Sequence, residues 1–238
     1  MLKTLKRKDY KTLSLSSLGG ALEFYDFVIF VFFANYIAKN FFPNEMSDFW
    51  KLLNTYGAFA AGYLARPLGG IVMAHFGDKL GRKKMFMLSI LLMVLPTFSL
   101  AFIPTYESIG YLAPIFLLFI RITQGIAIGG ELPGAWVFAK EHAPEGKDSF
   151  YISAINASMA FGILLGCVVS LAINYYFDQK SIYDYAWRIP FAIGGFFGII
   201  SIYLRTFLDE TPVFKKMYQE NNLEKFPLKT FFKEKNIF

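Results

Sequence analysis

Charged side chains stand inside long apolar stretches of this 238-residue sequence. Five residues do so: Glu23, Asp26, Arg66, Arg121 and Glu131. A charged group at the centre of an apolar membrane helix costs about 2.5–3.5 kcal/mol, so a partner or a function must offset each one. Intramembrane charges of this kind mark ion, proton or substrate pathways.

The two acids of the first apolar stretch, Glu23 and Asp26, are three residues apart and share a helix face. Two carboxylates held together in a low dielectric do not both stay charged without cost, so one of them can carry a proton. The alternative is permanent pairing with Arg66 or Arg121. We favour Asp26 and Glu131 as the functional carboxylates, because both lie in glycine-containing helices.

Arg121 and Gln124 lie one helical turn apart and face the same way, while Gly125 leaves room beside them for a neighbour or a ligand. A guanidinium there can bind a substrate carboxylate through two hydrogen bonds. It can equally serve as a fixed counter-ion. Both interpretations stay open from the sequence.

The stretches that hold these residues predict an all-α, polytopic membrane protein. Hydrophobic residues make up 55% of the chain, above the 45–50% or so that is typical of soluble domains, and about 20 apolar residues span a bilayer. Six spans are predicted, arranged three plus three: 13–38, 52–76, 85–104, 111–139, 150–177 and 187–208. Residues 1–12 form a basic N-terminal segment, 13–208 the bundle, and 209–238 a polar tail.

Basic residues predict the orientation, since Lys and Arg stay on the cytoplasmic side. With the N-terminus inside, the cytoplasmic segments, counted with Arg205 and the tail, hold 18 Lys and Arg, and the external segments hold four. Both termini are therefore expected in the cytoplasm. We interpret the net charge of +6 as this topological signal and expect no nucleic-acid partner.

Small residues recur every four positions in the fifth span, at Ala154, Ser158, Gly162, Gly166 and Ser170. They predict a groove along one helix face that lets another helix approach closely in lipid. The main interpretation is packing. Seams of this kind also serve helices that slide in transporters.

The predicted turn between the second and third spans carries Gly77, Asp78, Gly81, Arg82 and Lys83. The glycines predict a tight turn. Asp78 can hold a helix N-terminus or a basic partner, and Arg82 can bind acidic groups near another helix end. A simple basic stop signal would not need this order of residues.

That turn resembles the signature loop of the major facilitator superfamily, with Ala74 where the first Gly is usual. The branch of metabolite:proton symporters, which includes proline/betaine, α-ketoglutarate, shikimate and citrate carriers, is similar over nearly the whole chain. The matching stretches are 21–27, 66–70, Arg121 with 124–125, 129–131, 187–191 and 210–214.

The resemblance implies a proton-coupled uptake carrier of the bacterial inner membrane that works by alternating access. Asp78 and Arg82 would latch the cytoplasmic side, and the intramembrane acids and Arg121 would couple protons to a small organic solute. The energy source would be the proton gradient, with no cofactor. Family members have twelve spans, so we expect a second six-helix half as partner besides the lipid bilayer.

Two further hypotheses bear on the missing half. The chain can be a truncated, split or self-associating transporter, and it can instead be a non-transporting assembly or regulatory partner or an inactive remnant. An enzyme is not expected, because the sequence has no metal-ligand cluster, no nucleophile paired with a His in a span and no nucleotide-binding loop.

Overall fold

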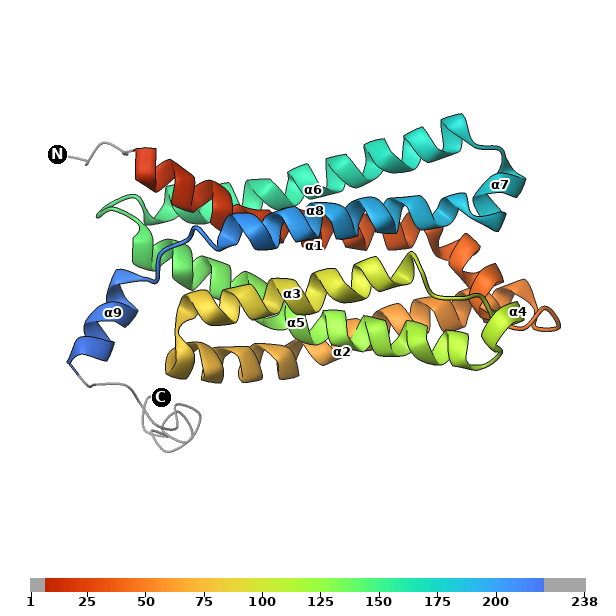
Figure 1. Ribbon diagram of the computed structural model, residues 1–238, viewed down its shortest axis with the longest axis horizontal. Helices are drawn as coiled ribbons and strands as arrows, with labels where there is room; N and C mark the ends of the chain where they lie inside the picture. The colour runs from red at the N-terminus through yellow and green to blue at the C-terminus, as the bar shows by residue number, and fades with distance from the viewer. Residues whose placement is uncertain (1–6, 221–238) are drawn as a thin grey trace.

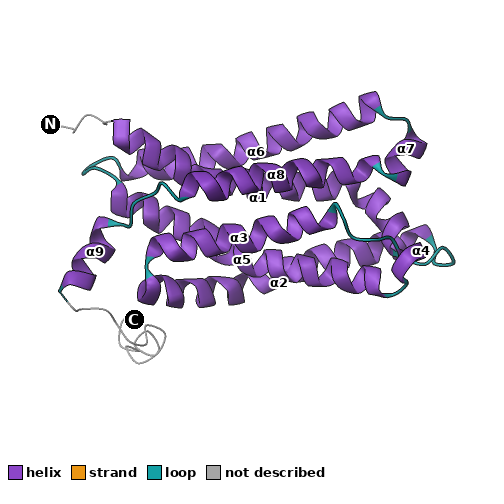
Figure 2. Ribbon diagram, viewed as in Figure 1, coloured by secondary structure: helices purple, strands orange, loops and turns teal. Residues whose placement is uncertain are grey.

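The computed structural model describes residues 7–220, and every regular element in that range is helical (Figure 2). The long helices follow the six predicted spans, and the short ones lie in the connections between them or after the last. The elements are α1 (Arg7–Phe41), α2 (Asp48–Leu80), α3 (Arg82–Leu100), α4 (Tyr106–Ile109), α5 (Leu112–His142), α6 (Asp148–Tyr176), α7 (Gln179–Asp184), the 3-10 helix η1 (Ala186–Arg188), α8 (Ile189–Arg205) and α9 (Pro212–Gln219).

The six long helices run side by side along the longest axis of the molecule (Figure 1). Helix α1 begins at one end of the bundle, where the α2–α3 turn and α9 also lie. The short helices α4 and α7 lie at the opposite end. This arrangement confirms the all-α bundle that the sequence predicts. It also puts the residues of the signature loop and those of α9 at the same end of the bundle.

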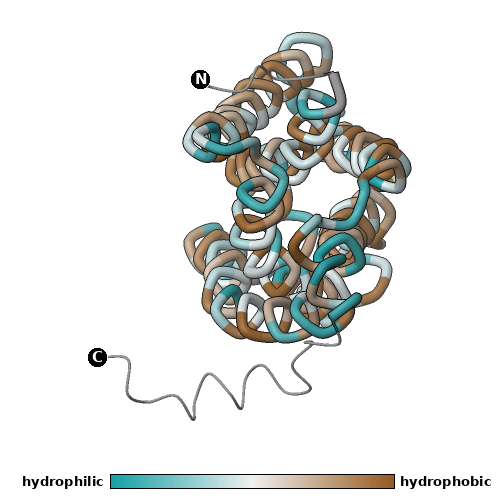
Figure 3. Tube along the Cα trace, turned by 90° about the vertical axis from the view of Figure 1, so that its left-hand side faces the viewer, coloured by the Kyte–Doolittle hydropathy of each residue, from teal (hydrophilic) through white to brown (hydrophobic). Residues whose placement is uncertain are grey.

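Among the described residues, five of these helices are long and apolar enough to cross a membrane: α1, α3, α5 and α6, together with the segment Ala186–Arg205 that contains α8. Helix α2 has 33 residues, but Lys51, Asn54 and Arg66 make its composition less apolar. Its outer face nevertheless carries exposed Leu64 and Leu68, as a lipid-facing surface requires. In the end view of Figure 3, hydrophobic residues are spread over all the long helices.

Glycines bring the backbones of α2 and α5 into contact. A Cβ added at Gly125 would collide with the Gly62 carbonyl, and one at Gly69 would collide with the Ile126 carbonyl. These positions tolerate no side chain, because each glycine of one helix sits directly against the backbone of the other. Close approach of this kind provides the dispersion contacts that hold helices together in lipid.

Part of the small-residue row of α6 packs against α1. Gly162 lies against the Ala21 carbonyl, and Gly166 lies against Val28. Ser170 is buried further along the same face, and Ala154 is partly buried toward the other end. Ser158 stands against Gly20. The row therefore forms a helix–helix seam.

Several helices extend beyond their apolar runs and begin or end outside the predicted spans. Within the described residues, α1 starts at Arg7 rather than at residue 13. The expected turn over 77–84 shrinks to Gly81, whose φ of 110° favours glycine, and Gly77 lies inside α2. Polar residues at helix ends still form backbone hydrogen bonds, so hydropathy underestimates helix length. Residues 1–6 and 221–238 of the two predicted terminal segments lie outside the described residues.

The α2–α5 contact predicts a large difference between two alanine substitutions. Gly125→Ala would lower the free energy of unfolding by about 1–3 kcal/mol through overpacking. Gly57→Ala is the matched control, because a Cβ there meets nothing within 4 Å, and it should leave stability unchanged or slightly raised. Thermal unfolding in detergent, followed by circular dichroism, measures both. Equal melting temperatures for the two variants would contradict the close contact.

Candidate functional site

The centre of the bundle holds a buried ion pair with a hydrogen-bond network around it. Arg121 Nη1 of α5 donates to Asp26 Oδ2 of α1 at 2.8 Å, and both side chains are buried. Asp26 Oδ1 lies 3.0 Å from the Thr97 hydroxyl of α3 and accepts from Gln124 Nε2 at 3.2 Å. Gln124 Nε2 also lies 2.8 Å from Thr97 Oγ1. One carboxylate thereby joins α1, α3 and α5.

A second ion pair lies next to the first, between Glu23 of α1 and Arg66 of α2. Glu23 Oε1 is 3.2 Å from Arg66 Nη1, and the Glu23 side chain is 2% exposed against 26% for Arg66. The Arg66 guanidinium also stacks on the Tyr63 ring, 3.9 Å from its centroid. The arginine of this pair is therefore partly exposed, whereas the carboxylate is buried.

Both pairs line one small pocket together with aromatic rings. Its wall includes Phe27 of α1 and Phe59 and Tyr63 of α2. The centroids of Phe27 and Phe59 are 5.2 Å apart, and those of Phe59 and Tyr63 are also 5.2 Å apart. A cation is attracted to the faces of such rings. The pocket thus combines two carboxylates, two guanidinium groups and an aromatic wall.

Several polar atoms of this pocket are buried without a hydrogen-bond partner in the described part of the chain. They are both Glu23 carboxylate oxygens, Nε of Arg66, Nε and Nη2 of Arg121, and Oε1 of Gln124. Buried polar groups are almost always hydrogen-bonded in proteins. The pocket therefore contains both hydrogen-bond acceptors and hydrogen-bond donors that have no partner in the described part of the chain.

Glu131 does not join this pocket, although the sequence groups it with the other acids. Glu131 Oε1 accepts from Arg205 Nη2 of α8 at 2.6 Å, and both side chains are fully buried. The Ser89 hydroxyl donates to Glu131 Oε2, and Arg205 Nη1 donates to the Phe86 carbonyl at 2.9 Å. Gly19 leaves the space that this pair fills, since a Cβ there would collide with it.

The sequence interpretation counts Arg205 with the cytoplasmic charges and does not predict that it is a buried partner of Glu131. It lies inside the predicted sixth span, 187–208, and that position is the signal that could have identified it as a buried partner. Thr97 and Ser89 are also missed. Single hydroxyls in an apolar helix give no such signal, because they can bond their own backbone.

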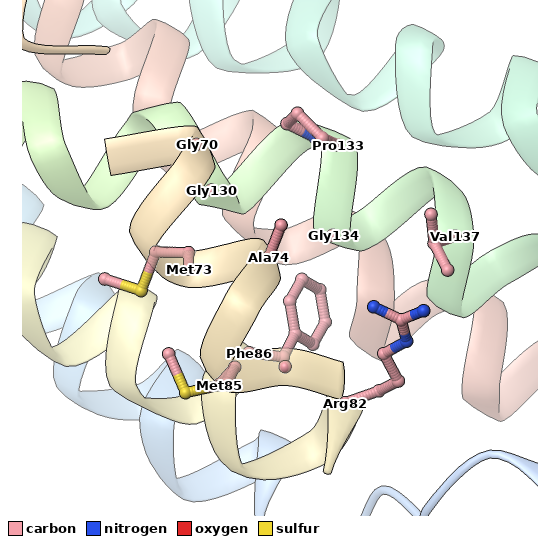
Figure 4. Close-up of a pocket in the computed structure, with 11 residues that line it drawn as sticks. Gly70, Met73, Ala74, Arg82, Met85, Phe86, Gly130, Pro133, Gly134 and Val137 are labelled. Atoms are coloured by element: carbon pink, nitrogen blue, oxygen red, sulfur yellow. The ribbon is translucent and has the colours of Figure 1, made fainter. Parts of the chain in front are cut away.

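The signature-loop residues form a separate polar cluster at the end of the bundle. Arg82 Nη1 lies 2.7 Å from Asp78 Oδ1, and Arg82 Nε lies 3.6 Å from Glu141 Oε1 of α5. The arginine also lines a cavity of about 90 Å³ between α2, α3 and α5. Figure 4 shows its guanidinium extending from the start of α3 toward Val137. Arg82 thereby connects the ends of α2, α3 and α5.

Glu210, in the segment before α9, binds the start of α3 next to this cluster. Its two carboxylate oxygens accept from the Lys83 backbone N–H, each at 3.1 Å, where the first turn of α3 has no intrahelical acceptor. Lys83 Nζ donates to the Thr206 carbonyl at 2.9 Å. Gly81 is needed for this approach, because a Cβ there would lie 2.5 Å from Glu210 Oε2. The connection between α8 and α9 is thus attached to the α2–α3 turn.

Fold and site together define a class: a multi-pass α-helical membrane protein with paired charges in its interior. Residues 13–225 match the family model described as "Sugar (and other) transporter", and the chain belongs to that family. The resemblance to the major facilitator superfamily is confirmed. Within residues 7–220, no group of three or more His, Cys, Asp or Glu side chains is arranged to hold a metal ion.

Curated relatives and solved structures agree with this assignment. The chain is 37% identical over 206 residues to the proline/betaine transporters of Escherichia coli (strain K12) and of Salmonella typhimurium (strain LT2), which covers 87% of this chain and 41% of each relative. The chain thus spans less than half the length of these relatives. The xylose transporter XylE from E. coli, in a partially occluded inward-open conformation, shares the fold with a TM-score of 0.79 at 18% identity, over 90% of this chain and 53% of XylE.

The Glu131–Arg205 pair predicts a strongly non-additive pair of substitutions. Arg205→Met leaves a buried carboxylate without its charge partner and should cost about 3–5 kcal/mol of stability. Combining it with Glu131→Gln removes both charges and should recover a large part of that loss. Chemical unfolding of the two single variants and the double variant measures the coupling.

An exposed pair provides the control for that cycle. Lys216 Nζ and Glu220 Oε1 are 3.9 Å apart and largely exposed, so Lys216→Ala should cost no more than about 1 kcal/mol. A similarly small loss for Arg205→Met would show that the buried pair is not required.

Proposed function

We propose that this chain is the N-terminal half of a proton-coupled secondary transporter for a small zwitterionic solute. The observation that carries the proposal is the pocket between α1, α2 and α5, where donors of Arg121 and Arg66 and Oε2 of Glu23 have no hydrogen-bond partner among the described residues, while Glu23 Oε1 is ion-paired with Arg66. A ligand that has both a carboxylate and an ammonium group satisfies both sets. A purely anionic or purely cationic ligand satisfies only one of them.

The aromatic wall supports the ammonium end of this ligand. Phe27, Phe59 and Tyr63 line the pocket beside Glu23, and aromatic faces bind quaternary and other ammonium groups by cation–π attraction. Arg121 supplies the carboxylate end, because a guanidinium matches a carboxylate with two parallel hydrogen bonds. The names of the proline/betaine relatives fit a solute of this type.

Of the intramembrane acids, we assign the transported proton to Glu23. Asp26 is held by Arg121, Gln124 and Thr97 together, and Glu131 is held by Arg205 and Ser89. Each of these two carboxylates is therefore bound by several side chains. Glu23 has a single partner among the described residues, the ion pair with Arg66, so protonation there disrupts the fewest interactions.

The transporter would lie in the bacterial inner membrane with both ends of this half in the cytoplasm, as the distribution of Lys and Arg predicts. A second six-helix half would complete the solute site, since in such carriers the site lies between repeats near the bilayer midplane. The Asp78–Arg82–Glu141 cluster would latch the cytoplasmic side and separate when the carrier opens inward.

Competition for uptake tests the ligand class. The chain is joined to the C-terminal half of the E. coli proline/betaine transporter and expressed in cells without their own betaine uptake. Glycine betaine should accumulate, and excess proline should compete, whereas a dicarboxylate and a simple quaternary amine should not. Arg121→Ala should abolish uptake while the two halves still co-purify. Competition by the dicarboxylate as strong as that by proline would instead assign a carboxylate carrier.

Imposed pH gradients test the proton assignment in vesicles that hold the same joined protein. Glu23→Gln mimics the protonated acid, so betaine exchange at equal pH should persist, whereas accumulation driven by the gradient should vanish. Asp26→Asn should abolish both, because it leaves Arg121 buried without its counter-ion. Cys167→Ala serves as a control outside this pocket. Gradient-driven accumulation by Glu23→Gln at the unsubstituted level would refute the role of Glu23.

A further inference from the structure

A second pocket lies at the end of the bundle that holds the signature loop, between the end of α2, the start of α3 and α9. Its lining includes the three lysines Lys79, Lys84 and Lys215 and the aromatic side chains of Phe214 and Tyr218. In Figure 1, α9 lies at this end and runs across the direction of the long helices. The pocket is therefore separate from the charged site at the bundle centre.

The one acid that lines this pocket is already engaged. The Glu210 carboxylate accepts from the backbone N–H groups of Lys83 and Thr211. Close by, Asp78 is paired with Arg82, and the Lys83 ammonium is bound to the Thr206 carbonyl. With three lysines and one carboxylate in its lining, the pocket carries a net positive charge.

Lys84 and Lys215 have no side-chain partner within residues 7–220, and both are exposed. They come from different elements, one from the first turn of α3 and one from α9. Glu210 and the Thr211 cap hold α9 in place, because the Phe214 N–H donates to Thr211 Oγ1 at 3.2 Å. Both lysines line the same pocket, on elements that these backbone contacts hold together.

Apolar side chains continue from this pocket along the outside of α2. Leu80 lines the pocket, and Phe76 lies one turn earlier on the same helix; both are exposed, as is Tyr218 of α9. In a membrane protein, exposed apolar residues directly below exposed lysines mark the boundary between acyl chains and headgroups. A ligand here meets positive charge at one end and apolar surface at the other.

We propose that this pocket binds the phosphate of an anionic phospholipid, with Lys84 and Lys215 contacting the headgroup and Leu80 and Phe76 contacting the acyl chains. Charge complementarity selects an anionic lipid, since basic residues at the membrane surface attract anionic headgroups. The apolar surface beside the lysines favours a lipid over a free anion. The site attaches α9, and with it the start of the segment after the sixth span, to the membrane surface.

Native mass spectrometry of the full 238-residue chain in detergent tests the site. Phosphatidylglycerol is titrated against the unsubstituted chain and against Lys84→Gln/Lys215→Gln. The double variant should bind about thirtyfold more weakly, since each lysine near an anionic surface contributes about fivefold in affinity. Lys216→Gln is the matched control, because Lys216 is exposed on α9 but does not line the pocket; it should bind phosphatidylglycerol like the unsubstituted chain.

Three outcomes would overturn the proposal. Equal loss in Lys216→Gln would mean that net charge alone attracts the lipid. Phosphatidylcholine retained as tightly as phosphatidylglycerol would mean that the apolar surface alone binds it. Displacement of the lipid by millimolar inorganic phosphate would assign the pocket to a free anion. Circular dichroism spectra and melting temperatures of the variants separate a binding loss from a folding loss, and none of these readouts depends on solute transport.

Discussion

The constraint on which the structure depends is that a charge in lipid must be paired inside the bundle. Asp26 and Arg121 satisfy this requirement at the centre, and through Thr97 and Gln124 they join α1, α3 and α5. Glu131 and Arg205 do the same for α5 and α8 nearer the signature loop. Removing either partner would leave an uncompensated charge in a low dielectric, so these pairs determine which helices lie next to one another.

Small residues make that pairing geometrically possible. Gly62 and Gly125 let α2 and α5 touch through their backbones, which brings Arg66 and Arg121 to the same pocket. Gly19 of α1 leaves the space that the Glu131–Arg205 pair occupies. The glycines and the charges therefore act together, because a charged side chain reaches its partner only where the helices approach closely.

The buried pairs differ in how completely they are satisfied, and this difference separates structural from functional charge. Arg205 is enclosed by Glu131, the Phe86 carbonyl and the Phe86 ring, 3.7 Å from the guanidinium carbon to the ring centroid. Glu23 and Arg121 keep buried polar atoms without partners. A pocket with unmatched atoms of both polarities is prepared for a ligand, whereas the Glu131–Arg205 pair, in which only Arg205 Nε lacks a partner among the described residues, holds helices together.

The sequence by itself determined the helices, because apolar runs and their lengths follow directly from what a bilayer requires of each segment. It also identified Glu23, Asp26, Arg66, Arg121 and Gln124, since charged and polar groups in apolar runs are conspicuous. Only the tertiary structure decided their partners. Helical periodicity gives the face on which a residue lies but not the helix opposite that face. Only the packing of the helices therefore shows that Glu131 pairs with Arg205 and that Thr97 binds Asp26. It also shows the lysine pocket beside α9.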